Sequence, residues 1–190
     1  MPPARRTRTA RRGEVPDPAT REHIDQVLTA CCDGPTIDLA CGSGRLADRL
    51  MRRGIAVLSV DLSPKSVAVT RSRGVPVLHR DLFARLPATG RWAYALLADG
   101  VVGLGGDPVR VLRRTRELLA PDGVAIVEFA PARADSPPRR NCPPTTAGLP
   151  WARVGVEHAA ALATAADLRL MTTATVAGHD IAWLTRNLPG

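Results

Sequence analysis

Residues 36–45 read Thr-Ile-Asp-Leu-Ala-Cys-Gly-Ser-Gly-Arg, an apolar run that carries one acid and ends in small residues and two glycines. A helical pattern follows directly, so this order predicts a buried strand, a tight turn and a helix. Small residues at such a turn leave the backbone open to a ligand. The helix would direct its unpaired N–H groups and the positive end of its dipole at the same ligand. The turn is therefore suited to an anionic group, either a phosphate or a carboxylate.

Apolar strands alternate with helices on both sides of this turn. Helices are predicted after Ser63-Pro64 and Asp107-Pro108, because each pair places a capping residue before a proline suited to the first helical position. Nearly continuous apolar strands of this kind indicate an α/β fold with a mostly parallel sheet. The predicted parallel strands are 36–40, 55–60, 75–78, 93–98 and 124–129, and the predicted helices are 20–32, 45–53, 63–74, 107–119 and 157–166.

The chain ends in a different pattern. Two strands, 168–176 and 181–184, are joined by the turn 177–180, which predicts an antiparallel hairpin at an edge of the sheet. The proline-rich residues 131–150 predict a loop without regular structure, and 121–123 (Pro-Asp-Gly) predict a turn before the fifth strand. We therefore expect one domain over 17–190, with a doubly wound, mostly parallel seven-stranded sheet.

Composition and charge limit the classes of protein to which this chain can belong. The chain has 190 residues and a formal net charge of +8, and five arginines with no acid fall within its first twelve residues. Residues 1–16 are thus predicted to be a disordered basic tail, either a phosphate-seeking arm or a solvated terminus. No stretch approaches the roughly eighteen consecutive apolar residues of a membrane span, and no signal segment follows the arginines. We expect a cytoplasmic protein without a metal site, since the four cysteines show no paired spacing.

Further acids follow the predicted strands. Ligands of doubly wound sheets bind beyond the carboxyl ends of the strands. Asp61 ends the second strand nineteen residues after Gly42, where a carboxylate can accept hydrogen bonds from the hydroxyls of a ribose. Asp81 follows the third strand and could accept from an adenine amino group, with Leu82 and Phe83 as apolar walls. The pattern predicts an adenosine-containing ligand whose other end lies at the glycine turn.

Two classes of ligand share these features. Residues 42–47 formally match the G-x-G-x-x-G/A dinucleotide pattern, so an NAD(P)-dependent oxidoreductase is one reading. Asp38, at the end of the first strand, is poorly suited to a pyrophosphate and better suited to a cationic amino or sulfonium group. A second nucleotide-binding half is also hard to find in a chain of this length.

The stretch 38–44, together with Asp61 and 81–82, resembles the class I S-adenosylmethionine-dependent methyltransferases, and 97–108 and 118–123 are similar to small bacterial members. The resemblance covers about 22–186. It implies strand order 3-2-1-4-5-7-6 with the seventh strand antiparallel, and S-adenosyl-L-methionine as cofactor, converted to S-adenosyl-L-homocysteine. The residues implied to contact it are Asp38, Ala40, Cys41, Gly42, Ser43, Gly44, Arg45, Asp61, Leu62, Ser63, Asp81, Leu82, Phe83, Ala98, Asp99 and Gly100.

The acceptor side departs from one branch of that family. Residues 99–102 (Asp-Gly-Val-Val) stand where the nucleic-acid amino-methylating branch carries an N/D-P-P-Y/F turn. A small-molecule acceptor is therefore favoured over nucleic acid. The acceptor-side candidates are Arg133, Trp151 and Arg153, around the proline-rich loop; the alternative is that this segment is a surface connection.

Methyl transfer from a sulfonium is an in-line displacement, so a general base is needed only when the acceptor must lose a proton. Asp99 is the candidate catalytic residue, although a role facing the cofactor or capping its loop is favoured over that of a base. His79 is expected to be structural, and His158 and His179 to be solvated. The predicted function is a small-molecule methyltransferase. The alternatives are the oxidoreductase and a non-catalytic accessory protein with the same fold.

Overall fold

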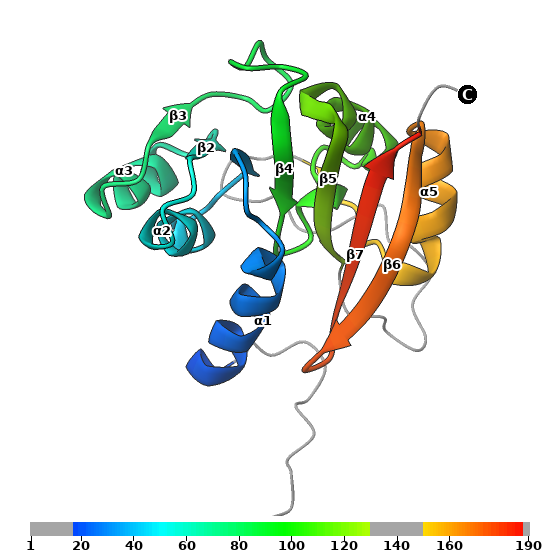
Figure 1. Ribbon diagram of the computed structural model, residues 1–190, viewed down its shortest axis with the longest axis horizontal. Helices are drawn as coiled ribbons and strands as arrows, with labels where there is room; N and C mark the ends of the chain where they lie inside the picture. The colour runs from blue at the N-terminus through cyan, green and yellow to red at the C-terminus, as the bar shows by residue number, and fades with distance from the viewer. Residues whose placement is uncertain (1–16, 130–149, 188–190) are drawn as a thin grey trace, which may run out of the picture.

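A computed structural model describes residues 17–129 and 150–187, and these form a seven-stranded sheet in the order β3-β2-β1-β4-β5-β7-β6 (Figure 1). β7 runs antiparallel to both β5 and β6, and the other pairs are parallel. The order and the antiparallel edge implied by the resemblance are confirmed. The strands are β1 (Thr36–Leu39), β2 (Val57–Asp61), β3 (Val77–His79), β4 (Trp92–Leu97), β5 (Leu119–Phe129), β6 (Leu168–Val176) and β7 (His179–Arg186).

The helices connect these strands, and two of the five begin at the predicted caps. Ser63 accepts a hydrogen bond from the Ser66 N–H, and Asp107 from the Arg110 N–H, each with a proline next in the chain. The helices are α1 (Pro18–Ala30), α2 (Arg45–Arg52), α3 (Pro64–Ser72), α4 (Pro108–Leu118) and α5 (Ala159–Ala165), with 3-10 turns η1 (Val101–Gly103) and η2 (Val156–His158).

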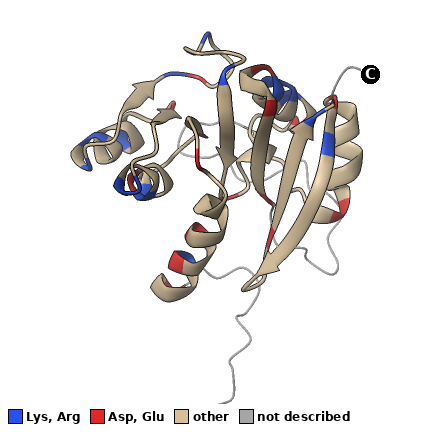
Figure 2. Ribbon diagram, viewed as in Figure 1, with Lys and Arg blue, Asp and Glu red and all other residues tan. Residues whose placement is uncertain are grey.

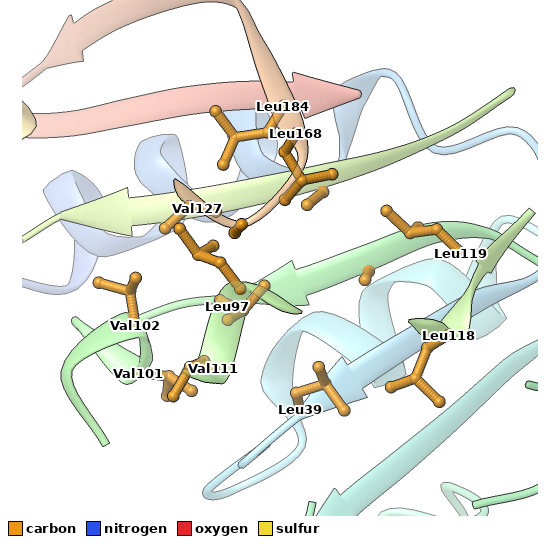
Figure 3. Close-up of a cluster of buried hydrophobic side chains, with 14 of the residues drawn as sticks. Leu39, Leu97, Val101, Val102, Val111, Leu118, Leu119, Val127, Leu168 and Leu184 are labelled. Atoms are coloured by element: carbon orange, nitrogen blue, oxygen red, sulfur yellow. The ribbon is translucent and has the colours of Figure 1, made fainter. Parts of the chain in front are cut away.

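Apolar side chains alternate between the two faces of the sheet because successive residues of a strand point to opposite sides. Leu96 of β4 and Ile126 of β5 pack with residues of α1 and α2. Their neighbours Leu97 and Val127 pack on the other face with Val111 of α4 and with α5, as Figure 3 shows. Burial on both faces explains why the central strands read as continuous apolar runs.

Four local predictions differ from the structure. Residues 121–123, predicted as a turn, lie within β5, where a break in register separates the pairs Trp92–Leu119 and Tyr94–Val124. The turn-forming residues bulge out of the strand there without ending it. The predicted helix 157–166 begins as the 3-10 turn η2, and β2 and β3 each begin two residues later than expected.

Several predictions fall outside the described residues, namely the basic tail 1–16, the proline-rich loop through residue 149 and the candidate Arg133. Across 17–129 and 150–187, no helix combines the length and the apolar character that a membrane crossing requires.

Candidate active site

The glycine turn after β1 is closed on one side and open on the other. Thr70 of α3 donates its hydroxyl hydrogen bond to the Gly42 carbonyl at 3.0 Å. A Cβ on Gly44, whose φ is +70°, would lie 2.6 Å from a Thr70 side-chain carbon, so no other residue fits there. A Cβ on Gly42 would meet nothing within 4 Å. The turn therefore rests against α3 and keeps its Gly42 side accessible.

Asp61, the last residue of β2, connects the glycine turn to the turn that follows β2. Its Oδ2 accepts a hydrogen bond from the Gly42 N–H at 2.9 Å, and its Oδ1 accepts from the Ser63 N–H at 2.8 Å. The loop after β3 is tied to the same residue, because the Arg80 N–H donates to the Asp61 carbonyl at 3.0 Å. Each carboxylate oxygen can accept more than one hydrogen bond, so Asp61 can serve the backbone and a ligand together.

Asp38 of β1 is the most unusual acid of the molecule. Its side chain is buried, and Oδ2 has no hydrogen-bond partner within the described ranges. Burial raises the pKa of Asp38 to about 7; the charge of Arg45 opposes this shift, and the neighbouring carboxylates add to it. An unpaired polar atom in a protein interior is unfavourable and calls for an explanation. A cationic ligand group would supply the missing partner.

The segment after β3 has one exposed acid and one aromatic ring. Asp81 Oδ1 accepts from the Phe83 N–H at 2.9 Å, and Leu82 is buried. Arg110 lies over the Phe83 ring, its guanidinium carbon 4.0 Å from the centroid. Arg114 donates to the Leu82 carbonyl at 2.9 Å. Helix α4 therefore fixes the place of this loop.

A charged network lies at the carboxyl end of β4. Asp99 has a φ of +55°, and its N–H donates to Glu128 Oε2 at 2.8 Å. The Asp99 carboxylate pairs with Arg45 at 2.9 Å and with Arg21 of α1 at 3.0 Å. Arg45 also holds Asp25 of α1, with an N–O distance of 2.9 Å. The ends of β1, β2 and β4 are thus joined into one site, and α1 lies against it (Figure 1).

The comparisons with known proteins agree with this geometry. The methyltransferase domain family matches residues 37–123. The ubiquinone biosynthesis O-methyltransferase of Cereibacter sphaeroides is 32% identical over 95 residues, which are 47% of this chain and 38% of that protein. An S-adenosylmethionine-dependent methyltransferase from Bacteroides fragilis, solved with S-adenosyl-L-homocysteine, superposes with a TM-score of 0.67 at 22% identity, covering 87% of this chain and 77% of that one. The 1,6-didemethyltoxoflavin N1-methyltransferase of Burkholderia thailandensis gives 0.64 at 22% identity, covering 90% and 79%.

Residues 37–123 match the model of the methyltransferase domain family, and the solved S-adenosylmethionine-dependent methyltransferases share the fold of this chain. The glycine turn, Asp61 and Asp99 all lie within 37–123. The match to the Cereibacter protein spans only 38% of the length of that relative. Within the described residues of this chain, no group of three or more His, Cys, Asp or Glu side chains could hold a metal ion.

Four residues of the candidate site were not predicted from the sequence: Arg21, Asp25, Glu128 and His179. Arg21 and Asp25 come from α1 and contact residues of the glycine turn and the β4 end. Glu128 is an acid inside the apolar run 124–129, and this isolated charge was the available signal. Burial raises the pKa of Glu128, but hydrogen bonds from His179 and the Asp99 N–H and the charge of Arg21 outweigh it and hold the pKa below its ordinary value.

His179 corrects one prediction. It was expected to be solvated in a turn, but it begins β7, and its side chain is only 15% exposed. Its Nδ1 lies 2.7 Å from Glu128 Oε1. The partner carboxylate explains the burial, because a polar side chain leaves water readily only when it is hydrogen-bonded. His79 is structural as expected, since its Nε2 lies 2.9 Å from the Leu62 carbonyl oxygen.

The two acceptor-side candidates that the structure describes, Trp151 and Arg153, differ in their burial. Trp151 forms an isolated bridge with Leu104 and packs against the apolar core, whereas Arg153 is exposed. The Ala152 N–H donates to the Gly103 carbonyl at 2.8 Å, and a Cβ on Gly103 would lie 1.8 Å from the Ala152 carbonyl oxygen. The segment after residue 149 is therefore docked on the loop that follows β4.

Proposed function

We propose that this chain is a methyltransferase that binds S-adenosyl-L-methionine at the glycine turn and transfers its methyl group in line to a small-molecule acceptor. The buried, unpartnered Oδ2 of Asp38 is the observation that carries the proposal. An anionic pyrophosphate next to this acid would be repelled, whereas an amino or sulfonium cation would give the oxygen a partner. The residues present therefore fit the cofactor of the family better than they fit NAD(P).

The rest of the site fits the other parts of the same ligand. Arg45 Nη2 is buried without a hydrogen-bond partner in the described chain, and it could receive the carboxylate of the methionyl group. Asp61 retains lone pairs for the ribose hydroxyls, and Asp81 is exposed next to the half-buried Phe83 ring, where an adenine could stack. In this proposal Asp99 positions Arg45 and Arg21 and does not itself react.

The bound cofactor would supply an activated methyl group on a positively charged sulfur. What the chain must add is alignment of the acceptor and exclusion of water. The docked segment around Trp151 and the buried Val101 and Val102 place apolar surface beside the β4 end. Apolar walls with few polar groups suit a small organic acceptor.

Nucleic acid is a poorer candidate despite the positive charge. Basic side chains gather on α2 and α4 (Figure 2). Several of them are already hydrogen-bonded to backbone carbonyls: Arg113 to Ala165 at 2.9 Å, and Arg116 to Asp167 at 3.2 Å. These two arginines link elements of the fold, so their charge is not by itself an indication of phosphate binding.

Calorimetric titration of the full chain with S-adenosyl-L-methionine, S-adenosyl-L-homocysteine and NADH tests the proposal. We expect micromolar binding of the first two and none of NADH. Asp61→Ala should weaken binding about tenfold or more through loss of its hydrogen bonds. Asp122→Asn is the matched control, because Asp122 is an exposed acid in the bulge of β5, away from the strands' carboxyl ends. Binding of NADH in preference would favour the oxidoreductase, and binding of no ligand would favour an accessory protein.

A further inference from the structure

His179 lies at the ligand edge of the sheet. β5 and β7 are antiparallel, with Phe129 opposite Asp180 and Glu128 opposite Ile181. The start of β7 therefore meets the carboxyl end of β5, which is the edge that also holds Asp99 and the glycine turn. In Figure 1 the turn between β6 and β7 and the N-terminal part of α1 lie toward this edge. The histidine is thus beside the site already described.

The hydrogen bonds of Glu128 decide which nitrogen of His179 carries a proton. The pKa of Glu128 is held below its ordinary value, so the carboxylate is ionised at neutral pH and can only accept hydrogen bonds. His179 Nδ1, 2.7 Å from Oε1, must then be the donor. In the neutral imidazole the lone pair is consequently on Nε2, as in sites where a carboxylate orients a catalytic histidine.

The surroundings leave that lone pair available. Over 17–129 and 150–187 the structure shows no hydrogen-bond partner for His179 Nε2, and the side chain is partly exposed. Arg21 of α1 lies 3.6 Å from Glu128 Oε1, so the same carboxylate oxygen contacts both Arg21 and His179. Asp180, the neighbour on β7, is engaged by the Thr175 hydroxyl. The other acid at this edge, Asp99, has both carboxylate oxygens engaged, one by Arg21 at 3.0 Å and the other by Arg45 at 2.9 Å.

We propose that His179 is the general base of the methyl transfer, that the buried Glu128 positions it, and that the acceptor is a hydroxyl, which must lose its proton and for which ring hydroxyls serve as probes. This inference rests on the proposed function. The acceptor O–H bond breaks and its proton passes to Nε2, while an electron pair of the oxygen forms the new O–CH₃ bond. The C–S bond breaks with its electron pair remaining on sulfur, and the imidazolium afterwards releases the proton to water.

Nuclear magnetic resonance tests the positioning without any acceptor. Long-range ¹H–¹⁵N correlation of the full chain at pH 8 should show His179 protonated on Nδ1 and unprotonated on Nε2. In Glu128→Gln the amide can donate as well as accept, so the Nε2–H tautomer should become populated. A wild-type signal of the Nε2–H tautomer, or of a doubly protonated ring at pH 8, would overturn the proposal.

His179→Asn is the sharpest variant for the chemistry. The Asn amide nitrogen can replace Nδ1 as donor to Glu128, whereas the lone pair of Nε2 is lost. With catechol, 3,4-dihydroxybenzoate or 1,4-dihydroxy-2-naphthoate as probes, the variant should lose about 100-fold or more in kcat, in the range of general-base effects. Its melting temperature and its affinity for S-adenosyl-L-methionine should stay unchanged.

An acceptor that is already ionised provides the control. The hydroxyl of 4-nitrocatechol is ionised at pH 8, so His179→Asn should reduce its methylation by less than threefold. Equal losses for catechol and 4-nitrocatechol would make His179 structural and overturn the proposal. A wild-type chain that binds the cofactor yet methylates none of these hydroxyls would overturn it too, and the proposed function would stand. Failure to bind the cofactor would instead reject the proposed function.

Discussion

Replacing Asp38 by Asn should stabilise the cofactor-free protein at high pH. The carboxyl of Asp38 has a pKa of about 7 because it is buried, against 3.8 for an aspartate exposed to water. The folded state therefore binds this proton more tightly than the unfolded state does. As pH rises from about 4 to about 7, the unfolded state ionises first and stability falls; above about 7 the penalty is constant.

The size of the effect follows from the shift. Each pKa unit corresponds to about 1.4 kcal/mol, so ionisation of the side chain lowers the free energy of unfolding by ~1.7 kcal/mol at pH 5 and ~4.3 kcal/mol at pH 8. Urea unfolding of wild type and Asp38→Asn, without cofactor, should show the stability gap widening by ~3 kcal/mol between these two pH values. Asp122→Asn should show no such widening. A gap that is the same at both pH values would refute the reasoning about Asp38.

Three further expectations concern other properties. The affinity for S-adenosyl-L-methionine should rise about tenfold from pH 6 to pH 8, because below a pKa of about 7 a cation that binds at Asp38 must displace the proton of the carboxyl group. Calorimetry at both pH values measures this change, and an affinity that does not vary with pH would count against a contact between the cation and Asp38. Gly44→Ala should destabilise the protein by ~3 kcal/mol or more, because its Cβ would lie 2.6 Å from a Thr70 carbon. Gly54→Ala, where φ is +76° and the space is open, should lose only ~1 kcal/mol in thermal unfolding, and equal losses would exclude the clash. The exposed Cys31 thiol, whose pKa is lowered by hydrogen bonds from the neighbouring thiol and an indole N–H, should react first with a disulfide reagent at pH 7, as peptide mapping would show.

The fold could be predicted from the sequence because its signals are local. The apolar runs, the capping residue before each proline and the glycine turn each decide one element without reference to the rest of the chain. The strand order came from the resemblance of 38–44, Asp61 and 81–82 to a family. The turn predicted at 121–123 became a bulge because pairing with β4 continues on both sides of it. Tertiary pairing outweighed the turn preference of these residues.

The charged half of the site could not be predicted, because its contacts join residues far apart in the chain. His179 meets Glu128 across 51 positions, and Arg45 meets Asp99 across 54. Each of these residues alone has an ordinary alternative as a solvated side chain. Only the pairing of β5 with β7 and the placement of α1 against the glycine turn bring them together. Long-range ion pairs leave no spacing pattern in a sequence.

The most direct test of the central claim is calorimetric titration with S-adenosyl-L-methionine at pH 6.5 in two buffers that differ in ionisation enthalpy. A cation bound at Asp38 predicts saturable binding with release of ~0.8 proton, the protonated fraction for a pKa of about 7. Asp38→Asn should release none. No binding, or binding by the wild type without proton release, would contradict the assignment of the glycine turn and Asp38 as the cofactor site.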